Sequence, residues 1–217
     1  MESTEISLYQ DYKKALLEGK KAYCKDIIQQ LIAEKADIKY IYLEFFQRSL
    51  YEVGELWESN QISVAREHLA TSITTQLMTL MYPLIFSSPK NGKNAIITCI
   101  DSEHHQIGAR MVADIFEISG WDTYYLGANT PVNELLRFLE KNLPDMLAVS
   151  LAIYSNYPHL LELLKQVHAQ HPDLKIIAGG QAFRWAKKDL LEGFPQVEYI
   201  PTLEKLQGLL TSKHKAL

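Results

Sequence analysis

The chain has 217 residues, of which 47% are apolar and 22% charged, as in an ordinary soluble globular protein. Its 22 Lys and Arg against 26 Asp and Glu give a formal net charge of −4, which argues against direct nucleic-acid binding, because such proteins normally carry a basic excess. No apolar stretch is long enough to span a bilayer and the polar N-terminus lacks a signal core, so we expect a cytoplasmic protein without membrane contact.

The first part of the chain is predicted to be helical. Apolar residues recur at helical spacing over 6–17, 22–33 and 38–57. Ser63 is a good N-cap for a fourth helix from 64 to about 86, which Pro83 is expected to kink or end early. Four helices with short connections predict a four-helix bundle over residues 1–88.

A polar segment with proline and glycine, SSPKNG at 87–92, predicts a linker, and the pattern changes after it. Short β-branched runs then alternate with helical segments, which predicts a second domain over residues 89–217. This alternation favours a doubly wound, flavodoxin-like parallel sheet of five strands, with the order 2-1-3-4-5. The predicted strands are 95–100, 123–126, 146–151, 174–178 and 197–200, with helices at 132–139, 159–167, 182–191 and 203–210.

The loop after the first predicted strand, DSEHHQIG at 101–108, carries acids and imidazoles and ends on a glycine. In a sheet of this order, ligands bind beyond the carboxyl ends of the strands, near this loop. A neutral imidazole such as His105 is a good transition-metal ligand, and a carboxylate two residues earlier, Glu103, can accept its other N–H. Gly108 would let a bulky ligand approach the backbone.

The spacing of Glu103, His105 and Gly108 resembles the Asp-x-His-x-x-Gly motif of cobalamin-binding domains, as found in methionine synthases and mutases. In that family the histidine replaces the cofactor's own base beneath cobalt. The resemblance therefore implies that His105 is the cobalt ligand. It implies that Glu103 takes the acidic position, a variant seen in B12-dependent photoreceptors.

Two further signatures of the family follow in the expected order. The Ser-x-Leu signature at the end of the third strand is Ser150-Leu151-Ala152 here, so the serine is kept and alanine stands in place of the leucine. The Gly-Gly signature after the fourth strand is Gly179-Gly180. The resemblance implies that Ser150 and the two glycines line the slot for the nucleotide tail.

Simpler interpretations exist for each residue. His105 would otherwise be an ordinary solvated loop histidine, and Gly179-Gly180 a plain tight turn between strand and helix. His104 is out of register and is expected to point to solvent. A doubly wound response domain without cobalamin is the alternative for the whole second half.

The helical half carries a pattern of its own, Trp57 followed after nine residues by Glu67-His68. It resembles the cap signature of photoreceptors that use adenosylcobalamin. The resemblance implies that Trp57 covers the adenosyl group and that Glu67 and His68 offer it hydrogen bonds. The alternative is a core tryptophan with a surface Glu-His pair.

Two features depart from those photoreceptors. The residue after this tryptophan is a histidine in the best-known of them, and here it is Glu58. They also carry a MerR-type DNA-binding domain before the bundle, whereas this sequence starts at the bundle. We therefore expect output through a protein partner or a change of assembly, without direct DNA contact.

The main functional hypothesis is a light sensor that holds adenosylcobalamin between the cap and the α/β domain. Breakage of the cobalt–carbon bond would change its conformation or its homo-oligomeric assembly, so we expect a cofactor-binding sensor and not an enzyme with turnover. The alternative is a corrinoid methyl carrier of a methyltransferase system, which would use methylcobalamin. A third possibility is cobalamin binding for storage or sensing without photochemistry.

Overall fold

The structure is a computed structural model that describes residues 2–184, 191 and 193–212. The chain divides into two compact units, Met1–Leu84 and Ile85–Leu217. None of the helices among the described residues combines the length and the apolar character needed to cross a bilayer.

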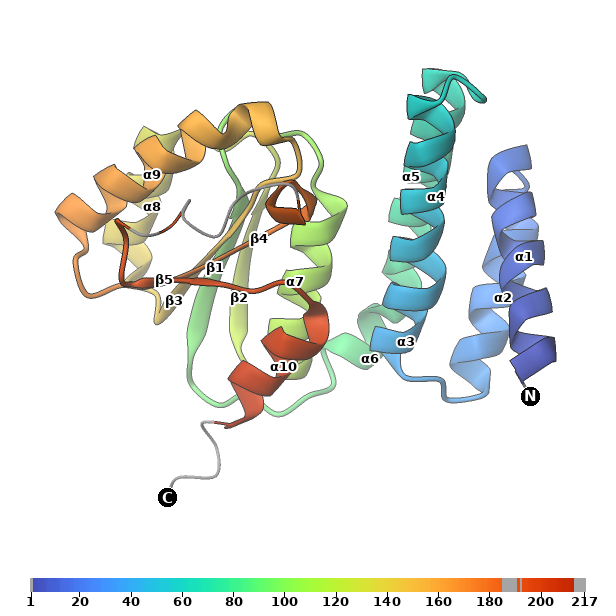
Figure 1. The fold of residues 1–217 in the computed structure, drawn as a ribbon. Coiled ribbons are helices and arrows are strands. Elements are labelled where there is room, and N and C mark those ends of the chain that lie inside the picture. Colours follow the sequence, from blue (N-terminus) through green and yellow to red (C-terminus); the bar gives the residue numbers. More distant parts are fainter. Residues whose placement is uncertain (1, 185–190, 192, 213–217) are drawn as a thin grey trace. The chain divides into compact units, whose positions relative to one another are not determined.

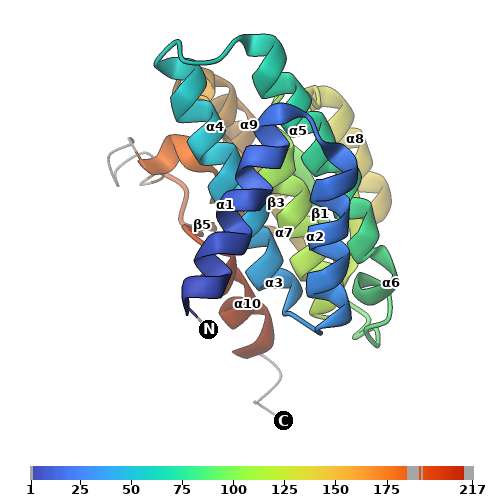
Figure 2. The same cartoon turned by 90° about the vertical axis from the view of Figure 1, so that its right-hand side faces the viewer.

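The first unit consists of helices that run alongside one another (Figures 1 and 2). Its core is formed by large side chains that are fully buried, among them Tyr12, Ile28 and Phe46. The four helical stretches expected from the sequence are present. The helices are α1 (Glu2–Glu18), α2 (Lys21–Ala33), α3 (Ile38–Tyr40), α4 (Arg48–Glu58), α5 (Val64–Met78) and α6 (Tyr82–Ile85).

The stretch predicted as one helix over 38–57 is helical throughout, but its segment Ile41–Gln47 is wound as a π-helix between α3 and α4. Ile41, Tyr42, Phe45 and Phe46 are all buried, which places two adjacent pairs of side chains on the inner face. This spacing is also that of an ordinary α-helix, so the sequence did not indicate the π-helical segment.

The fourth predicted helix begins as expected and ends earlier. The side chain of Ser63 accepts a hydrogen bond from the backbone N–H of Arg66 at 3.4 Å, so Ser63 is the N-cap of α5. The helix does not continue to 86: α5 ends at Met78, and a 3-10 turn leads into α6. Pro83 lies in the first turn of α6, where its missing N–H needs no partner within the helix.

The second unit is built on a five-stranded parallel sheet with the order β2-β1-β3-β4-β5, which confirms the predicted flavodoxin-like arrangement. Helices α8 and α9 cover one face, and α7 and α10 cover the other (Figure 1). The strands are β1 (Asn94–Cys99), β2 (Asp122–Gly127), β3 (Met146–Ser150), β4 (Lys175–Gly179) and β5 (Val197–Tyr199). The helices are α7 (Ile107–Ile118), α8 (Val132–Asn142), α9 (Tyr157–Gln170) and α10 (Leu203–Ser212).

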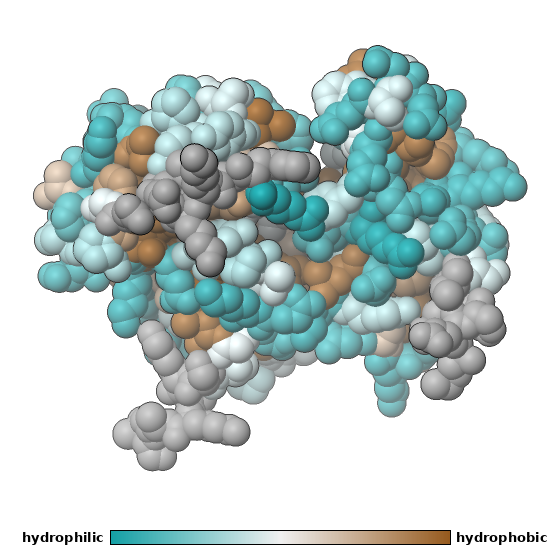
Figure 3. Space-filling model, in the orientation of Figure 1, coloured by the Kyte–Doolittle hydropathy of each residue, from teal (hydrophilic) through white to brown (hydrophobic). Residues whose placement is uncertain are grey.

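On one face of the sheet, leucines of α8 and α9 pack against buried residues of β1, β3 and β4 and form a hydrophobic core. The outer surface seen in Figure 3 is mostly hydrophilic, with hydrophobic residues in small separate groups. The helix predicted over 182–191 begins as a 3-10 turn, Gln181–Arg184. Positions 185–190 of that prediction lie outside the described residues.

The second half of the predicted linker, residues 90–92, is hydrogen-bonded to the α/β unit. Lys90 donates hydrogen bonds to the carboxylate of Glu117 and, at 2.8 Å, to the carbonyl of Trp121. The backbone N–H of Asn91 donates to the carbonyl of Gly120 at 2.7 Å. The chain is therefore tied to the turn between α7 and β2 before β1 begins.

Candidate functional site

The carboxyl edge of the sheet brings together the residues that the sequence marks at three separate places. In the register of the sheet, Cys99 at the end of β1 pairs with Ser150 at the end of β3, and Ser150 pairs with Gly179 at the end of β4. The loop that carries His105 leaves β1 at this edge. Ser150 itself is half-buried.

The carboxylate of Glu103 holds His105 by two hydrogen bonds. Its Oε1 atom accepts from the backbone N–H of His105 at 3.0 Å and lies 2.7 Å from Nδ1 of the imidazole. Because one oxygen of Glu103 makes both contacts, it holds the imidazole ring of His105 and the backbone of His105 at the same time. The predicted pairing of Glu103 with His105 is thus formed within the protein alone.

The other carboxylate oxygen of Glu103 is bound by a different loop. Oε2 accepts from the backbone N–H groups of Ala152 and Ile153, each at 2.9 Å, and from Nδ2 of Asn156 at 3.4 Å. Burial by itself raises the pKa of Glu103, but the hydrogen bonds from His105, Ile153 and Ala152 outweigh it and lower that pKa to about 2. Glu103 is therefore a carboxylate at neutral pH, although its side chain is fully buried.

A carboxylate that accepts from Nδ1–H selects the tautomer of His105 whose lone pair is on Nε2. That is the arrangement in which proteins present an imidazole to a transition metal. The side chain of His105 is 58% exposed. The adjacent His104 is exposed as well, as expected for a residue that points to solvent.

Gly108, the last residue of the motif, adds no side chain near the loop of His105. Gly108 lies exposed in the first turn of α7, and a Cβ atom built on it would meet no atom within 4 Å. An imidazole oriented by a buried carboxylate has the chemistry that the metal of a corrinoid requires of its ligand. His105 is the residue that would ligate its metal.

The glycine pair after β4 has a structural reason of its own. Gly180 has φ +113°, and a Cβ atom there would lie 2.1 Å from the carbonyl oxygen of Leu151. A Cβ on Gly179 would lie 3.0 Å from the carbonyl oxygen of Ile200. The plain-turn interpretation therefore describes the geometry of Gly180. The predicted contact of both glycines with a nucleotide tail stays a prediction.

In the helical unit, Trp57 and the pair Glu67-His68 flank the turn between α4 and α5. The side chain of Trp57 is 44% exposed, so it is not the core tryptophan of the simpler interpretation. The Glu67 carboxylate lies 2.5 Å from Nδ1 of His68 and accepts a hydrogen bond from Thr71 at 2.8 Å. His68 is exposed and Glu67 is half-buried.

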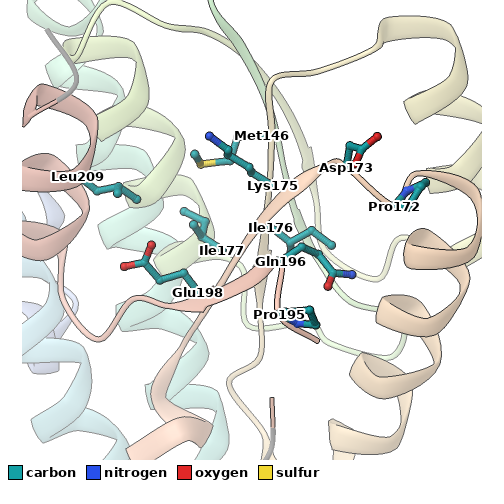
Figure 4. Close-up of a pocket in the computed structure, with 10 residues that line it drawn as sticks. All are labelled: Met146, Pro172, Asp173, Lys175, Ile176, Ile177, Pro195, Gln196, Glu198 and Leu209. Atoms are coloured by element: carbon teal, nitrogen blue, oxygen red, sulfur yellow. The ribbon is translucent and has the colours of Figure 1, made fainter. Parts of the chain in front are cut away.

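A pocket of about 400 Å³ lies elsewhere, at the amino ends of β3, β4 and β5 (Figure 4). Met146 and Lys175, the first residues of β3 and β4, line it together with Glu198. It opens at the opposite edge of the sheet from the loop of His105. No residue predicted for the site lines this pocket.

The sequence did not reveal the partners that hold Oε2 of Glu103. Asn156 precedes a helix with a proline in its first turn, so its local sequence indicates only an N-cap. Ala152 and Ile153 act through backbone groups, which any residue except proline could supply. These contacts join positions about fifty residues apart, and only the fold brings them together.

The chain matches two family models, each described as a B12 binding domain, over residues 93–201 and residues 8–82. It is similar to the HTH-type transcriptional repressor CarH of Myxococcus xanthus, at 24% identity over 179 residues, which are 80% of this chain and 58% of CarH. With the HTH-type transcriptional repressor CarA of the same organism it shares 31% identity over 90 residues, 42% of this chain and 31% of CarA. The chain thus spans less than two thirds of the length of these relatives.

A solved structure shares the fold. The monomethylamine corrinoid protein of Methanosarcina barkeri superposes with a TM-score of 0.82, covering 95% of this chain and 98% of that chain. The sequence identity is 14%, so the likeness is one of fold.

Proposed function

Since the chain belongs to the B12-binding domain family and its cofactor is a cobalamin, we propose that it binds adenosylcobalamin and acts as a light sensor, with His105 as the lower axial ligand. The observation that carries this proposal is the Glu103–His105 pair, in which a buried carboxylate orients an exposed imidazole. The acidic residue of the pair is glutamate, as in the B12-dependent photoreceptors that the sequence resembles.

Each residue of the carboxyl edge has a role in this proposal. His105 binds cobalt through Nε2, and Glu103 holds the ring so that little rotational freedom is lost on binding. Gly108 leaves the space that the corrin ring needs. Ser150 and Gly179-Gly180 line the slot for the nucleotide tail. The cofactor supplies a cobalt–carbon bond that light can break.

The helical unit supplies the contacts that distinguish one upper ligand from another. The exposed indole of Trp57 covers the adenosyl group, and Glu67 and His68 offer hydrogen bonds to its polar atoms. When that group departs, Trp57 loses its contact and α4 and α5 shift or the homo-oligomer changes. A ligand that is bound in one state and absent in the other is what biases such a switch. A protein partner receives the signal.

One observation favours a corrinoid methyl carrier as the second candidate. Glu58 follows Trp57, so the histidine found at this position in the best-known photoreceptors is absent. A carrier would hold methylcobalamin, with a methyltransferase as its partner. The same role of His105 serves both candidates, and the upper ligand separates them.

The experiment is to load the purified protein with adenosylcobalamin in the dark, remove free cofactor, and record absorption spectra and elution volumes before and after green light. We expect a bound dark spectrum that converts irreversibly and an elution volume that changes with it. His105→Ala should lose the spectrum of the histidine-ligated cofactor. His104→Ala, the neighbouring exposed imidazole, is the matched control and should behave as the wild type.

The possible outcomes separate the candidates. Equal binding of methyl- and adenosylcobalamin, with no change of elution volume on illumination, would exclude the sensor and favour the methyl carrier. If His105→Ala and His104→Ala give the same spectra as the wild type, His105 is not the ligand.

A further inference from the structure

The residue before Glu103 is held in a conformation that few side chains adopt. Ser102 has φ +64°, in the left-handed region that residues other than glycine rarely occupy. Such a conformation costs free energy and persists where surrounding contacts impose it. Because Ser102 immediately precedes Glu103, its backbone sets the direction in which the segment 103–105 leaves β1.

Two asparagine side chains hold the backbone of Ser102, one on each polar group. Its N–H donates to Oδ1 of Asn129 at 2.8 Å, and its carbonyl accepts from Nδ2 of Asn156 at 3.2 Å. Asn129 comes from the loop after β2, and Asn156 comes from the loop after β3. Neighbouring loops on either side of β1 therefore fix one residue between them.

Both asparagines also bind Glu103 itself. The backbone N–H of Asn129 donates to the carbonyl of Glu103 at 2.9 Å, and Nδ2 of Asn156 reaches the carboxylate at 3.4 Å. Asn156 occupies the N-cap position of α9, yet its side chain makes no capping hydrogen bond. A side chain that could stabilise its own helix is directed to the ligand loop instead.

We propose that Asn129 and Asn156 are positioning residues for the metal ligand, which hold Ser102 and Glu103 so that His105 meets cobalt in one orientation. The proposal rests on the proposed role of His105. Residues that orient a metal ligand through a hydrogen bond commonly change metal affinity by 10- to 100-fold when replaced. Each asparagine contributes a different half of its amide: Asn129 accepts through Oδ1, and Asn156 donates through Nδ2.

This difference allows a sharp test, because the same substitution should have opposite results at the two positions. Asn129→Asp keeps an acceptor for the N–H of Ser102. Asn156→Asp removes the donor and places a carboxylate against the oxygens of Ser102 and Glu103. Asn129→Ala removes the acceptor without adding charge. Asn133→Asp, at an exposed position of α8, is the control for the added charge.

The readouts are the affinity for hydroxocobalamin and the electron paramagnetic resonance spectrum of the bound cobalamin reduced to the cobalt(II) state. Labelling the protein with ¹⁵N-histidine changes the nitrogen splitting in this spectrum only if a histidine binds the cobalt. We expect Asn156→Asp and Asn129→Ala to weaken binding about tenfold and to reduce the histidine splitting. Asn129→Asp and Asn133→Asp should keep both close to the wild type.

The outcomes distinguish this inference from the proposed function. A wild type without histidine splitting would overturn the role of His105. A wild type with that splitting, matched by Asn156→Asp and Asn129→Ala, would overturn the inference alone. Equal losses in Asn129→Asp and Asn156→Asp would also overturn it, because charge and not hydrogen-bond direction would explain both. Circular dichroism and urea unfolding of each variant without cofactor show whether a loss reflects misfolding.

Discussion

The carboxylate of Glu103 and the imidazole of His105 lie 2.7 Å apart, yet the first side chain is fully buried and the second is 58% exposed. The pair thus joins the interior of the α/β unit to its surface. Because Glu103 is held by backbone groups of another loop, the orientation of His105 depends on contacts made by a buried carboxylate.

Replacing Glu103 by glutamine should destabilise the protein without cofactor. Glutamine keeps the shape but presents an NH₂ group to N–H donors, and it loses hydrogen bonds to a charged acceptor. We expect the free energy of unfolding at pH 7 to fall by about 3 kcal/mol. Urea unfolding measures the loss, with Glu134→Gln, at an exposed helical position, as a control that should change little.

The same pair predicts a dependence on pH. The pKa of Glu103 is lowered in the folded state from 4.5 to about 2, so its carboxylate stabilises the fold above pH 4.5. That contribution is lost as the pH falls from 4.5 through 2. The difference in unfolding free energy between the wild type and Glu103→Gln should therefore narrow over this range. A constant difference down to pH 2.5 would contradict the assignment.

Gly180→Ala should be strongly destabilising. A Cβ atom on residue 180, which has φ +113°, would lie 2.1 Å from the carbonyl oxygen of Leu151. Because that oxygen belongs to the backbone, rotating a side chain cannot relieve the clash. We expect a loss of more than about 3 kcal/mol in thermal or urea unfolding. Gly208→Ala in α10, where a Cβ meets no atom within 4 Å, should instead stabilise by about 0.5–1 kcal/mol.

Both cysteines should be unreactive in the folded protein. Burial raises the pKa of the Cys24 thiol to about 11, and burial with the charge of Glu103 raises that of Cys99 to about 12. The thiolate, which is the reactive form, is therefore scarce at pH 8. A chromogenic disulfide reagent should label neither cysteine without denaturant and both in urea. Fast labelling of native protein would show that one of these sites opens readily.

Trp57→Ala should reduce the preference for the adenosyl ligand. Loss of an aromatic side chain stacked on a nucleobase typically costs about 1–3 kcal/mol, so adenosylcobalamin should bind about tenfold or more weakly. The affinity of the variant for hydroxocobalamin should equal that of the wild type, because this cobalamin lacks the adenosyl group. Tyr23→Ala, another exposed aromatic of the helical unit, is the control. Equal weakening of both cobalamins would contradict the role of Trp57.

The parts of the fold that follow from local pattern could be predicted from the sequence. Short apolar runs identified all five strands, and their alternation with helices indicated a parallel sheet, because parallel strands need crossover connections. The order 2-1-3-4-5 came from the flavodoxin-like arrangement, which is common among such sheets. Ser63 was identified as a cap because its hydroxyl serves an N–H only three residues ahead. The Glu103–His105 contact was also predictable, since it spans two residues of one loop.

The remaining features depend on packing between distant segments. The π-helical segment at 41–47 could not be predicted, because its buried residues have the spacing of an ordinary α-helix. The contact of Asn156 with Glu103 joins residues 53 positions apart, so its local sequence shows only a helix start. The reason for glycine at Gly180 is likewise the carbonyl of another strand's loop.

The close approach of Gly180 to Leu151 also affects how related sequences should be interpreted. A protein could lose its cofactor during evolution and still be selected to keep this glycine, because without it the two loops would collide. The glycine therefore reflects a requirement of the fold, whether or not a cofactor is bound. In the proposed function the chemistry belongs to the acid and the imidazole two positions apart, so a homologue that lacks this pair but keeps the glycine should share the fold without the cobalt ligand.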